Sequence, residues 1–87
     1  MNWMIVWPPD ALQLLSKSYL EIDDTTQFTA ACNYLEAALS LAPLTVGVAL
    51  LDEVRSLVAP PIGVMFKCYE SDRIVLILRV WRIPTKP

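Results

Sequence analysis

The sequence predicts an α+β fold, in which a short N-terminal strand and an α-helical hairpin precede a mostly antiparallel β-sheet. Two patterns predict it: apolar residues recur at three- and four-residue steps in the first half of the chain, and strand-like apolar runs separated by turn residues fill the second half. Helices followed by consecutive strands are typical of α+β domains, whose helices pack on one face of the sheet. With 87 residues, the chain can form one small domain, which we predict over residues 1–87.

The first elements are a strand over residues 3–7 and a helix over residues 9–21. Between Trp3 and Trp7, aromatic and β-branched residues alternate at period two, which is typical of a strand. Pro8-Pro9 ends this strand, because proline donates no hydrogen bond to a ladder. A single apolar helical face then follows, formed by Leu12, Leu15, Tyr19 and Ile22.

A second helix is predicted over residues 25–41. Asp24 precedes it and Gln27 stands at its third position, which is the spacing of a capping box. About three residues separate the two helices, so they form an antiparallel hairpin. The apolar stripe of the second helix comprises Phe28, Ala31, Cys32, Leu35, Ala38 and Leu39.

Three strands are predicted in the second half, over residues 53–59, 64–69 and 74–83. Residues 44–51 are apolar but follow neither period, and they stay without an assignment. A two-residue loop at Ser71-Asp72 joins the last two strands into a hairpin. The cross-strand pairs that this loop predicts are Tyr69 with Ile74 and Lys67 with Leu76.

The composition excludes disorder and several kinds of active site. Hydrophobic residues make up 55% of the chain and charged residues 18%, so the chain can bury a core. It contains no histidine, which excludes Ser-His and Cys-His nucleophile pairs. Cys32 and Cys68 lack the spacing of a zinc site; we expect buried free thiols in a reducing compartment, with one disulfide as the alternative. We therefore expect no metal and no cofactor.

No stretch of the sequence predicts a membrane span or a secretory signal. The longest uncharged run, residues 37–51, is interrupted by Pro43 and Gly47 and is shorter than the roughly 18 apolar residues that a span needs. The first residues lack the positive charge of a signal peptide. We therefore expect a cytoplasmic protein with no membrane partner.

The two halves of the chain differ in charge. Residues 1–43 carry one base and five acids, a balance of −4, whereas residues 44–87 carry six bases and four acids, a balance of +2. The net charge of −2 averages these two values. Because the basic half is the predicted sheet, the asymmetry indicates an anionic partner for the sheet. The six bases are Arg55, Lys67, Arg73, Arg79, Arg82 and Lys86.

Three segments carry a resemblance to a known family. They are residues 5–11 (IVWPPDA), 59–66 (APPIGVMF) and 72–82 (DRIVLILRVWR). Together with the order of strand, helical hairpin and three strands, they make the chain resemble the RelE/ParE superfamily of bacterial toxins. This superfamily belongs to type II toxin–antitoxin systems and includes plasmid-stabilisation-like proteins. The resemblance covers nearly the whole chain in layout, with residues 44–56 matched only loosely.

The resemblance implies a RelE/ParE-like fold and a toxin that a small antitoxin protein holds inactive. It also implies two classes of target. Ribonuclease members of the family cut messenger RNA on the ribosome, using arginine and lysine with a C-terminal tyrosine or histidine. Other members act on gyrase and lack most of that residue set.

The sequence departs from the ribonuclease pattern in three places. Family members often carry an arginine before the third strand, but this chain has Ile62-Gly63 at the corresponding place. No tyrosine or histidine follows Trp81. The net charge is acidic, whereas proteins that bind the ribosome are usually basic. The endoribonuclease residue set is therefore incomplete, and the pattern argues against an enzyme.

Five residues are the candidates for a surface that binds a target or an antitoxin: Arg55, Lys67, Arg79, Trp81 and Arg82. Arginine and lysine attract phosphates or an acidic protein, and tryptophan beside arginine is a common anchor of interfaces. The alternative is that the bases are solvated strand positions and that Trp81 is a core residue. In the predicted hairpin register, Lys67 and Arg79 lie on opposite faces of the sheet. Gly63 is expected to serve a tight turn after Pro60-Pro61.

The leading hypothesis is a toxin-family protein that acts by protein binding and is held inactive by an antitoxin. Two alternatives stay open. One is a ribosome-dependent mRNA endoribonuclease, and the other is a degenerate, non-toxic family member that serves as a homodimeric interaction module.

Overall fold

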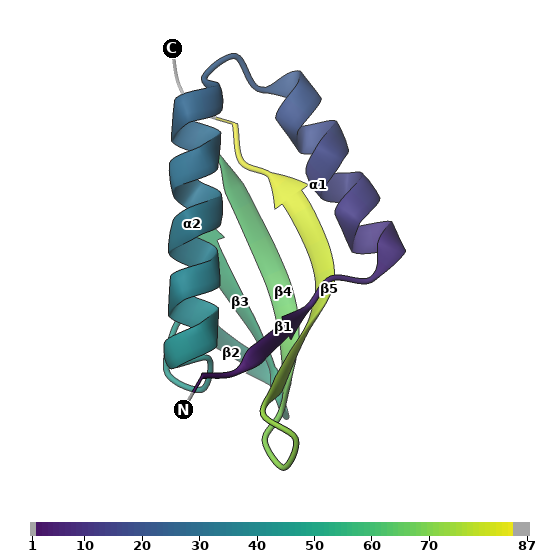
Figure 1. The fold of residues 1–87 in the computed structure, drawn as a ribbon, viewed down its shortest axis with the longest axis vertical. Helices are drawn as coiled ribbons and strands as arrows, with labels where there is room; N and C mark the ends of the chain where they lie inside the picture. Colours follow the sequence, from purple (N-terminus) through teal and green to yellow (C-terminus); the bar gives the residue numbers. More distant parts are fainter. Residues whose placement is uncertain (1, 85–87) are drawn as a thin grey trace.

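A computed structural model describes residues 2–84 of the chain (Figure 1). Lys86, one of the six bases counted above, lies outside the described residues. The two helices and five strands follow one another in the predicted order, with one strand more than predicted. The elements are β1 (Met4–Val6), α1 (Pro9–Glu21), α2 (Thr25–Leu41), β2 (Val48–Leu51), β3 (Val54–Ala59), β4 (Ile62–Tyr69) and β5 (Ile74–Arg82).

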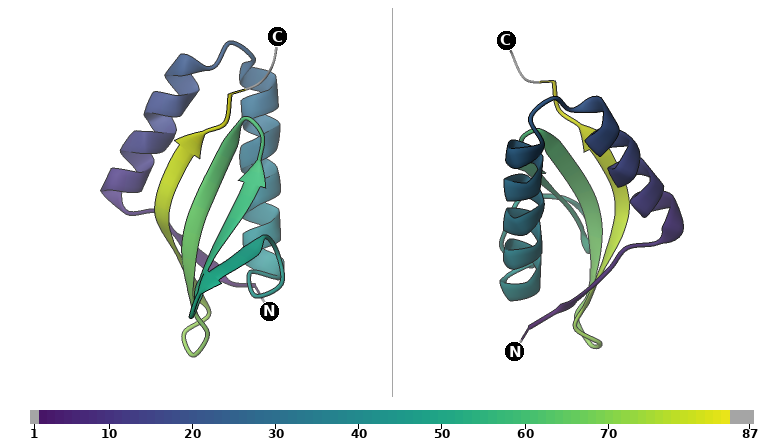
Figure 2. Two further views of the ribbon diagram at one scale, coloured as in Figure 1. Left: turned by 180° about the vertical axis from the view of Figure 1, so that it is seen from behind. Right: turned by 45° about the horizontal axis from the view of Figure 1, so that its top comes forward.

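The five strands form one sheet in the order β1-β5-β4-β3-β2. β1 runs parallel to β5, and all other neighbours are antiparallel, which confirms the prediction of a mostly antiparallel sheet. α1 packs along β5, and α2 packs against β3 and β1. Both helices lie on the same side of the sheet, and the view from behind shows the other side without a covering element (Figure 2).

Both helices have the predicted bounds, because their start signals are local. Pro9 occupies the first turn of α1, where its missing N–H is not needed. The Oδ1 atom of Asp24 accepts a hydrogen bond of 3.0 Å from the backbone N–H of Gln27, which caps α2 as predicted. None of the helices within residues 2–84 is long and apolar enough to cross a membrane.

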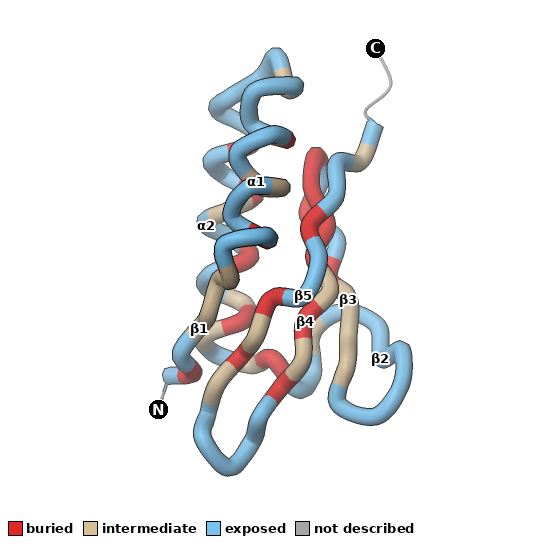
Figure 3. The backbone as a smooth tube through the Cα atoms, turned by 90° about the vertical axis from the view of Figure 1, so that its right-hand side faces the viewer, coloured by how far each residue is buried: buried red, intermediate tan, exposed pale blue. Residues whose placement is uncertain are grey.

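The core lies between the helices and the sheet. Leu35 and Leu39 of α2 are buried in one core cluster with alternate residues of β4 and β5. Trp3 is buried and Trp7 packs at the margin of the core. Buried residues alternate with more exposed ones along the second half of β4 and the first half of β5, whereas β2 is exposed throughout (Figure 3). The buried sheet residues are Leu57, Ala59, Ile62, Val64, Phe66, Cys68, Val75, Ile77 and Val80.

The sequence does not predict β2, and the structure shows what forms it. β2 pairs with β3 and is one of the two edges of the sheet, with β1 at the other. Gly47 precedes it with φ +72°, a left-handed conformation that glycine adopts without strain. A Cβ atom at this position would also collide with the carbonyl oxygen of Ser56, so glycine is required where the chain enters the strand.

The β4–β5 register corrects one prediction. The pairs Tyr69–Ile74 and Lys67–Leu76 are as predicted next to the turn. A β-bulge between Met65 and Phe66 then shifts the register, so that Met65 pairs with Arg79. Because a one-residue shift turns every later side chain to the other face, Arg79 lies on the same face as Lys67. The prediction that these two residues lie on opposite faces was wrong.

Candidate functional site

The candidate site is the face of the sheet that the helices do not cover, which we call the outer face. In β4, the alternation of side chains places Ile62, Val64, Phe66 and Cys68 in the core and the residues between them on the opposite side. The strand pairing extends this assignment to the other four strands. The outer face comprises Met4, Val6, Val48, Leu51, Val54, Ser56, Val58, Gly63, Met65, Lys67, Tyr69, Ile74, Leu76, Arg79 and Trp81.

The outer face is mainly apolar, and much of it is open to solvent. Met4, Val48 and Leu51 are each about two-thirds exposed, and Val58 is half exposed. These residues come from β1, β2 and β3, so the open apolar surface spans the width of the sheet. Soluble monomers rarely expose apolar patches of this kind unless a partner or ligand covers them.

Two charged residues stand on the outer face, and both are cations. Lys67 and Arg79 have no acidic side chain within ion-pair distance in the part of the chain that the structure describes. The Nζ atom of Lys67 lies 5.1 Å from the centroid of the Tyr69 ring, a cation–π contact. Arg79 stands beside Met65 in the neighbouring strand. The outer face is therefore an apolar surface that carries positive charge.

Trp81 lies on the outer face over Gly63. A Cβ atom at Gly63 would approach the indole ring to 2.6 Å, so the ring packs directly on the glycine backbone. The expected tight turn at Gly63 was wrong: the residue lies within β4, and its missing side chain makes room for the indole. Trp81 remains 37% exposed, which also corrects the alternative of a core tryptophan.

The other two predicted site residues lie on the helix side of the sheet. Arg55 donates hydrogen bonds from Nε to the carbonyl oxygen of Val46 (2.9 Å) and from its guanidinium to that of Gly47 (3.3 Å). The Nε atom of Arg82 lies 3.8 Å from a carboxylate oxygen of Glu21 in α1. The structure therefore groups Lys67, Arg79 and Trp81 on one face and separates Arg55 and Arg82 from them.

Sequence reasoning missed the apolar part of the outer face. The sequence predicts Met4, Val58 and Met65 as strand residues but assigns them to no face of the sheet, although the alternation in residues 54–59 places Val58 opposite the core residue Leu57. The predicted hairpin of two helices packs on one face of the sheet, so the other face is expected to stay uncovered. Residues 48 and 51 could not be placed, because β2 was not predicted.

Neither thiol is suited to nucleophilic chemistry. Burial raises the pKa of Cys32, and the nearby carboxylate of Glu36 raises it further. Burial is also the main cause of the raised pKa of Cys68, which Arg55 partly opposes. Both cysteines are free, and Cys68 lies in the core. Because the thiolate is the reactive form, both side chains stay protonated and act as small apolar residues.

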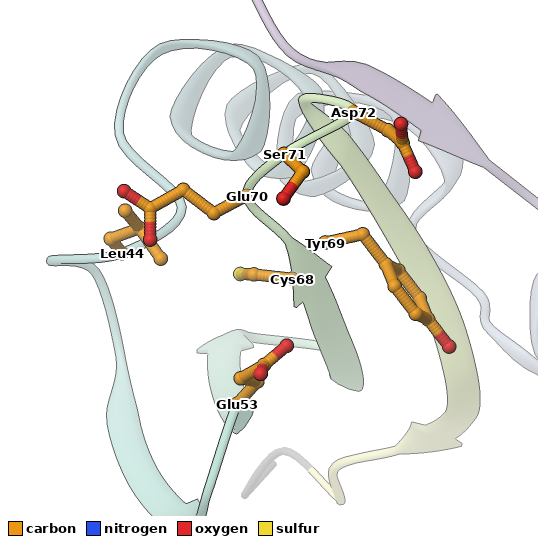
Figure 4. Close-up of a pocket in the computed structure, with 7 residues that line it drawn as sticks. All are labelled: Leu44, Glu53, Cys68, Tyr69, Glu70, Ser71 and Asp72. Carbon is orange, nitrogen blue, oxygen red and sulfur yellow. The ribbon is translucent and has the colours of Figure 1, made fainter.

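A hollow beside the β4–β5 turn is lined by acidic side chains (Figure 4). Glu53 precedes β3, whereas Glu70 and Asp72 belong to the turn, and Tyr69 projects away from Cys68 on the other side of β4. Within residues 2–84, no group of three acidic, histidine or cysteine side chains could hold a metal ion. The outer face is therefore the stronger candidate for the functional site.

Comparisons with known proteins identify the fold. No protein-family model matches this sequence, and no curated protein matches it. A chain in the crystal structure of the toxin–antitoxin complex RelBE2 from Mycobacterium tuberculosis superimposes with a TM-score of 0.75. The match has 20% sequence identity and covers 94% of this chain and 99% of that chain. The chain therefore has the α+β fold of RelE-like toxins, as predicted.

Proposed function

We propose that this chain is the toxin subunit of a type II toxin–antitoxin pair, that it acts by binding protein, and that its antitoxin covers the outer face. One observation carries the proposal: the helix-free face of the sheet is open, apolar and positively charged. The similarity of the fold to a chain of a toxin–antitoxin complex supports the same assignment. The location that fits this function is the cytoplasm.

The chemistry of the outer face defines the antitoxin segment that fits it. Apolar side chains of the segment cover Met65, Val58 and the exposed ring of Trp81. Carboxylates on the segment lie near Lys67 and Arg79, which have no acidic partner in the described part of this chain. Complementary charge speeds association and fixes orientation, while the buried apolar surface provides most of the free energy of binding.

Binding rather than bond cleavage is the activity that the residues favour. The sequence has no histidine, the commonest general base, and the raised pKa of both thiols argues against a cysteine nucleophile. A toxin that binds and blocks its target needs only a complementary surface. Of the targets that the family resemblance implies, gyrase fits such a mode of action.

Coexpression with the product of a small neighbouring reading frame tests the proposal. We expect the two chains to copurify, and expression of this chain alone to arrest growth. Arg79→Glu places a like charge against the antitoxin and should weaken the complex at least tenfold. The matched control is Lys17→Glu on the exposed side of α1, which should leave the complex unchanged. If Arg79→Glu reduces copurification no more than Lys17→Glu does, the proposal is contradicted.

The endoribonuclease alternative gains one observation from the structure. Lys67, Tyr69 and Arg79 share the outer face, whereas the predicted register would have separated the two cations. Several cations around one phosphate can stabilise the charge that develops during RNA cleavage. If this alternative holds, messenger RNA isolated during growth arrest carries new ends at ribosome-bound codons, and Arg79→Ala abolishes them. Arrest without such ends favours binding.

A further inference from the structure

The segment from the end of α2 to the end of β2 has an unusual concentration of exposed apolar side chains. Leu41, Val48 and Leu51 are about two-thirds exposed, Leu50 is half exposed and Leu44 is 43% exposed. The exposed apolar side chains are not confined to the outer face, because Leu41 and Leu44 do not belong to the sheet. Val48 and Leu51 stand at the β2 margin of the outer face, but neither the core nor an antitoxin segment at Lys67 and Arg79 explains the exposure of Leu41, Leu44 and Leu50.

β2 is also an open edge of the sheet. It pairs with β3 on one side, and no described strand pairs with it on the other. An edge strand presents unpaired N–H and C=O groups that can bind another strand. Natural edges are commonly protected by lysine, proline or an inward charge, and Val48–Leu51 contains none of these. One protection is present, a bulge between Ala49 and Leu51, which shortens the length available for pairing.

The absence of charge identifies the occupant that suits this edge. Residues 37–51 contain no charged side chain, whereas the helical hairpin is acidic and the outer face carries two cations. A second copy of the hairpin or of the outer face would meet like charge. A second copy of the β2 edge would meet an uncharged, apolar surface like itself. The β2 edge can therefore pair with the β2 edge of a second copy without repulsion between like charges.

Charge at the end of β2 also selects the direction of pairing. Asp52 and Glu53 directly follow the strand. In a parallel pair, these acids from the two copies would lie side by side. In an antiparallel pair, they lie at opposite ends, separated by roughly 13 Å for four residues of strand, which exceeds the screening length of roughly 8 Å in physiological salt.

We propose that two copies of this chain form a symmetric dimer through antiparallel pairing of their β2 strands, which joins the two sheets into one. Leu50 and Leu51 of each copy cover apolar residues of the other. β3 separates β2 from Lys67 in β4, and both β3 and β4 separate it from Arg79 and Trp81 in β5, so these residues of both copies stay free for an antitoxin. The pairing is short, so the dimer is weak and depends on protein concentration.

Sedimentation of the full chain across a concentration series tests this proposal. We expect the mass to rise from monomer to dimer as concentration increases. Leu51→Lys should raise the dissociation constant at least tenfold, because pairing would bury an unpaired ammonium group. The control is Leu20→Lys on α1, an even more exposed leucine, which should leave dimerisation unchanged. A monomer at every concentration, or equal effects of the two variants, would overturn the proposal.

Amide hydrogen exchange of the unmodified chain provides the second measurement if Leu51→Lys fails to fold. Protection of the β2 amides should increase with protein concentration in the absence of any other protein. Protection that requires the antitoxin instead would assign the edge to the antitoxin and overturn the dimer. Arg79→Glu should not alter dimerisation, so failure of the antitoxin proposal and failure of this one give different results.

Discussion

Alternate residues of β4 lie on two faces of the sheet that differ in their surroundings. On the helix side, Ile62, Val64 and Phe66 are fully buried under α1 and α2. On the outer face, Met65 and Lys67 are half-buried and no other element lies over them. The same eight residues therefore stabilise the fold through one face and offer a binding surface through the other. Mutations at adjacent positions should affect different properties of the protein.

The largest effect should come from the covered face. Phe66→Ala removes a fully buried ring and should lower the free energy of unfolding by roughly 3–5 kcal/mol. Val58→Ala, on the outer face, should cost less than about 1 kcal/mol because the side chain is already half exposed. Urea denaturation of both variants measures the difference. Equal losses of unfolding free energy would show that the outer face stabilises the fold as much as the buried face does.

The next effect concerns the packing of Trp81 on the outer face. Gly63→Ala introduces a Cβ atom that must displace the indole, at a cost of about 1–3 kcal/mol. The indole N–H resonance of Trp81 should shift, while those of Trp3 and Trp7 stay in place. The variant should also weaken antitoxin binding, because the displaced ring no longer fits the partner. An unchanged Trp81 resonance would contradict the packing described here.

A pair of arginines compares the two faces most directly. Arg55→Ala removes hydrogen bonds to the carbonyl oxygens of Val46 and Gly47 and should destabilise the fold by about 1–2 kcal/mol without altering antitoxin affinity. Arg79→Ala should do the reverse, with stability unchanged to within about 0.5 kcal/mol and weaker binding. Thermal unfolding and calorimetric titration of both variants separate the two roles. Interchanged results would refute the assignment of faces.

The smallest effect should come from the helix cap. Asp24→Ala removes the side-chain acceptor for the N–H of Gln27 and should cost about 1 kcal/mol of stability. Antitoxin binding should stay the same, because the cap belongs to the helical layer. Asp24→Asn is the matched control, since asparagine also caps helices and should retain most of the stability. A loss as large for Asn as for Ala would point to charge rather than capping.

The helices and the turn-proximal register could be predicted because their signals are local. Asp24 and Gln27 mark one helix start, and Ser71-Asp72 sets the β4–β5 pairing next to the turn. The position of Arg79 could not be predicted in this way. The register shifts between the pairs Phe66–Ile77 and Met65–Arg79, so β5 holds one extra residue, Leu78, and no turn residue marks that place.

The charged residues of the candidate site could be predicted from the sequence, but its apolar residues could not. Lys67, Arg79 and Trp81 were identified as site residues by their chemistry, but the face that they share depends on the bulge. β2 escaped prediction because a fully apolar run shows neither the alternation of a strand nor the period of a helix. Gly63 was misread because the ring that requires it lies far away in the sequence.

Hydroxyl-radical footprinting of this chain, free and in complex with the proposed antitoxin, tests the central claim most directly. Tryptophan, tyrosine and methionine oxidise readily, and both layers of this molecule carry exposed examples. The account predicts that the antitoxin protects Trp81, Tyr69 and Met65 on the outer face and leaves Tyr34 of α2 as reactive as in the free chain. Protection of Tyr34 with Trp81 still reactive would place the antitoxin on the helices and contradict the account.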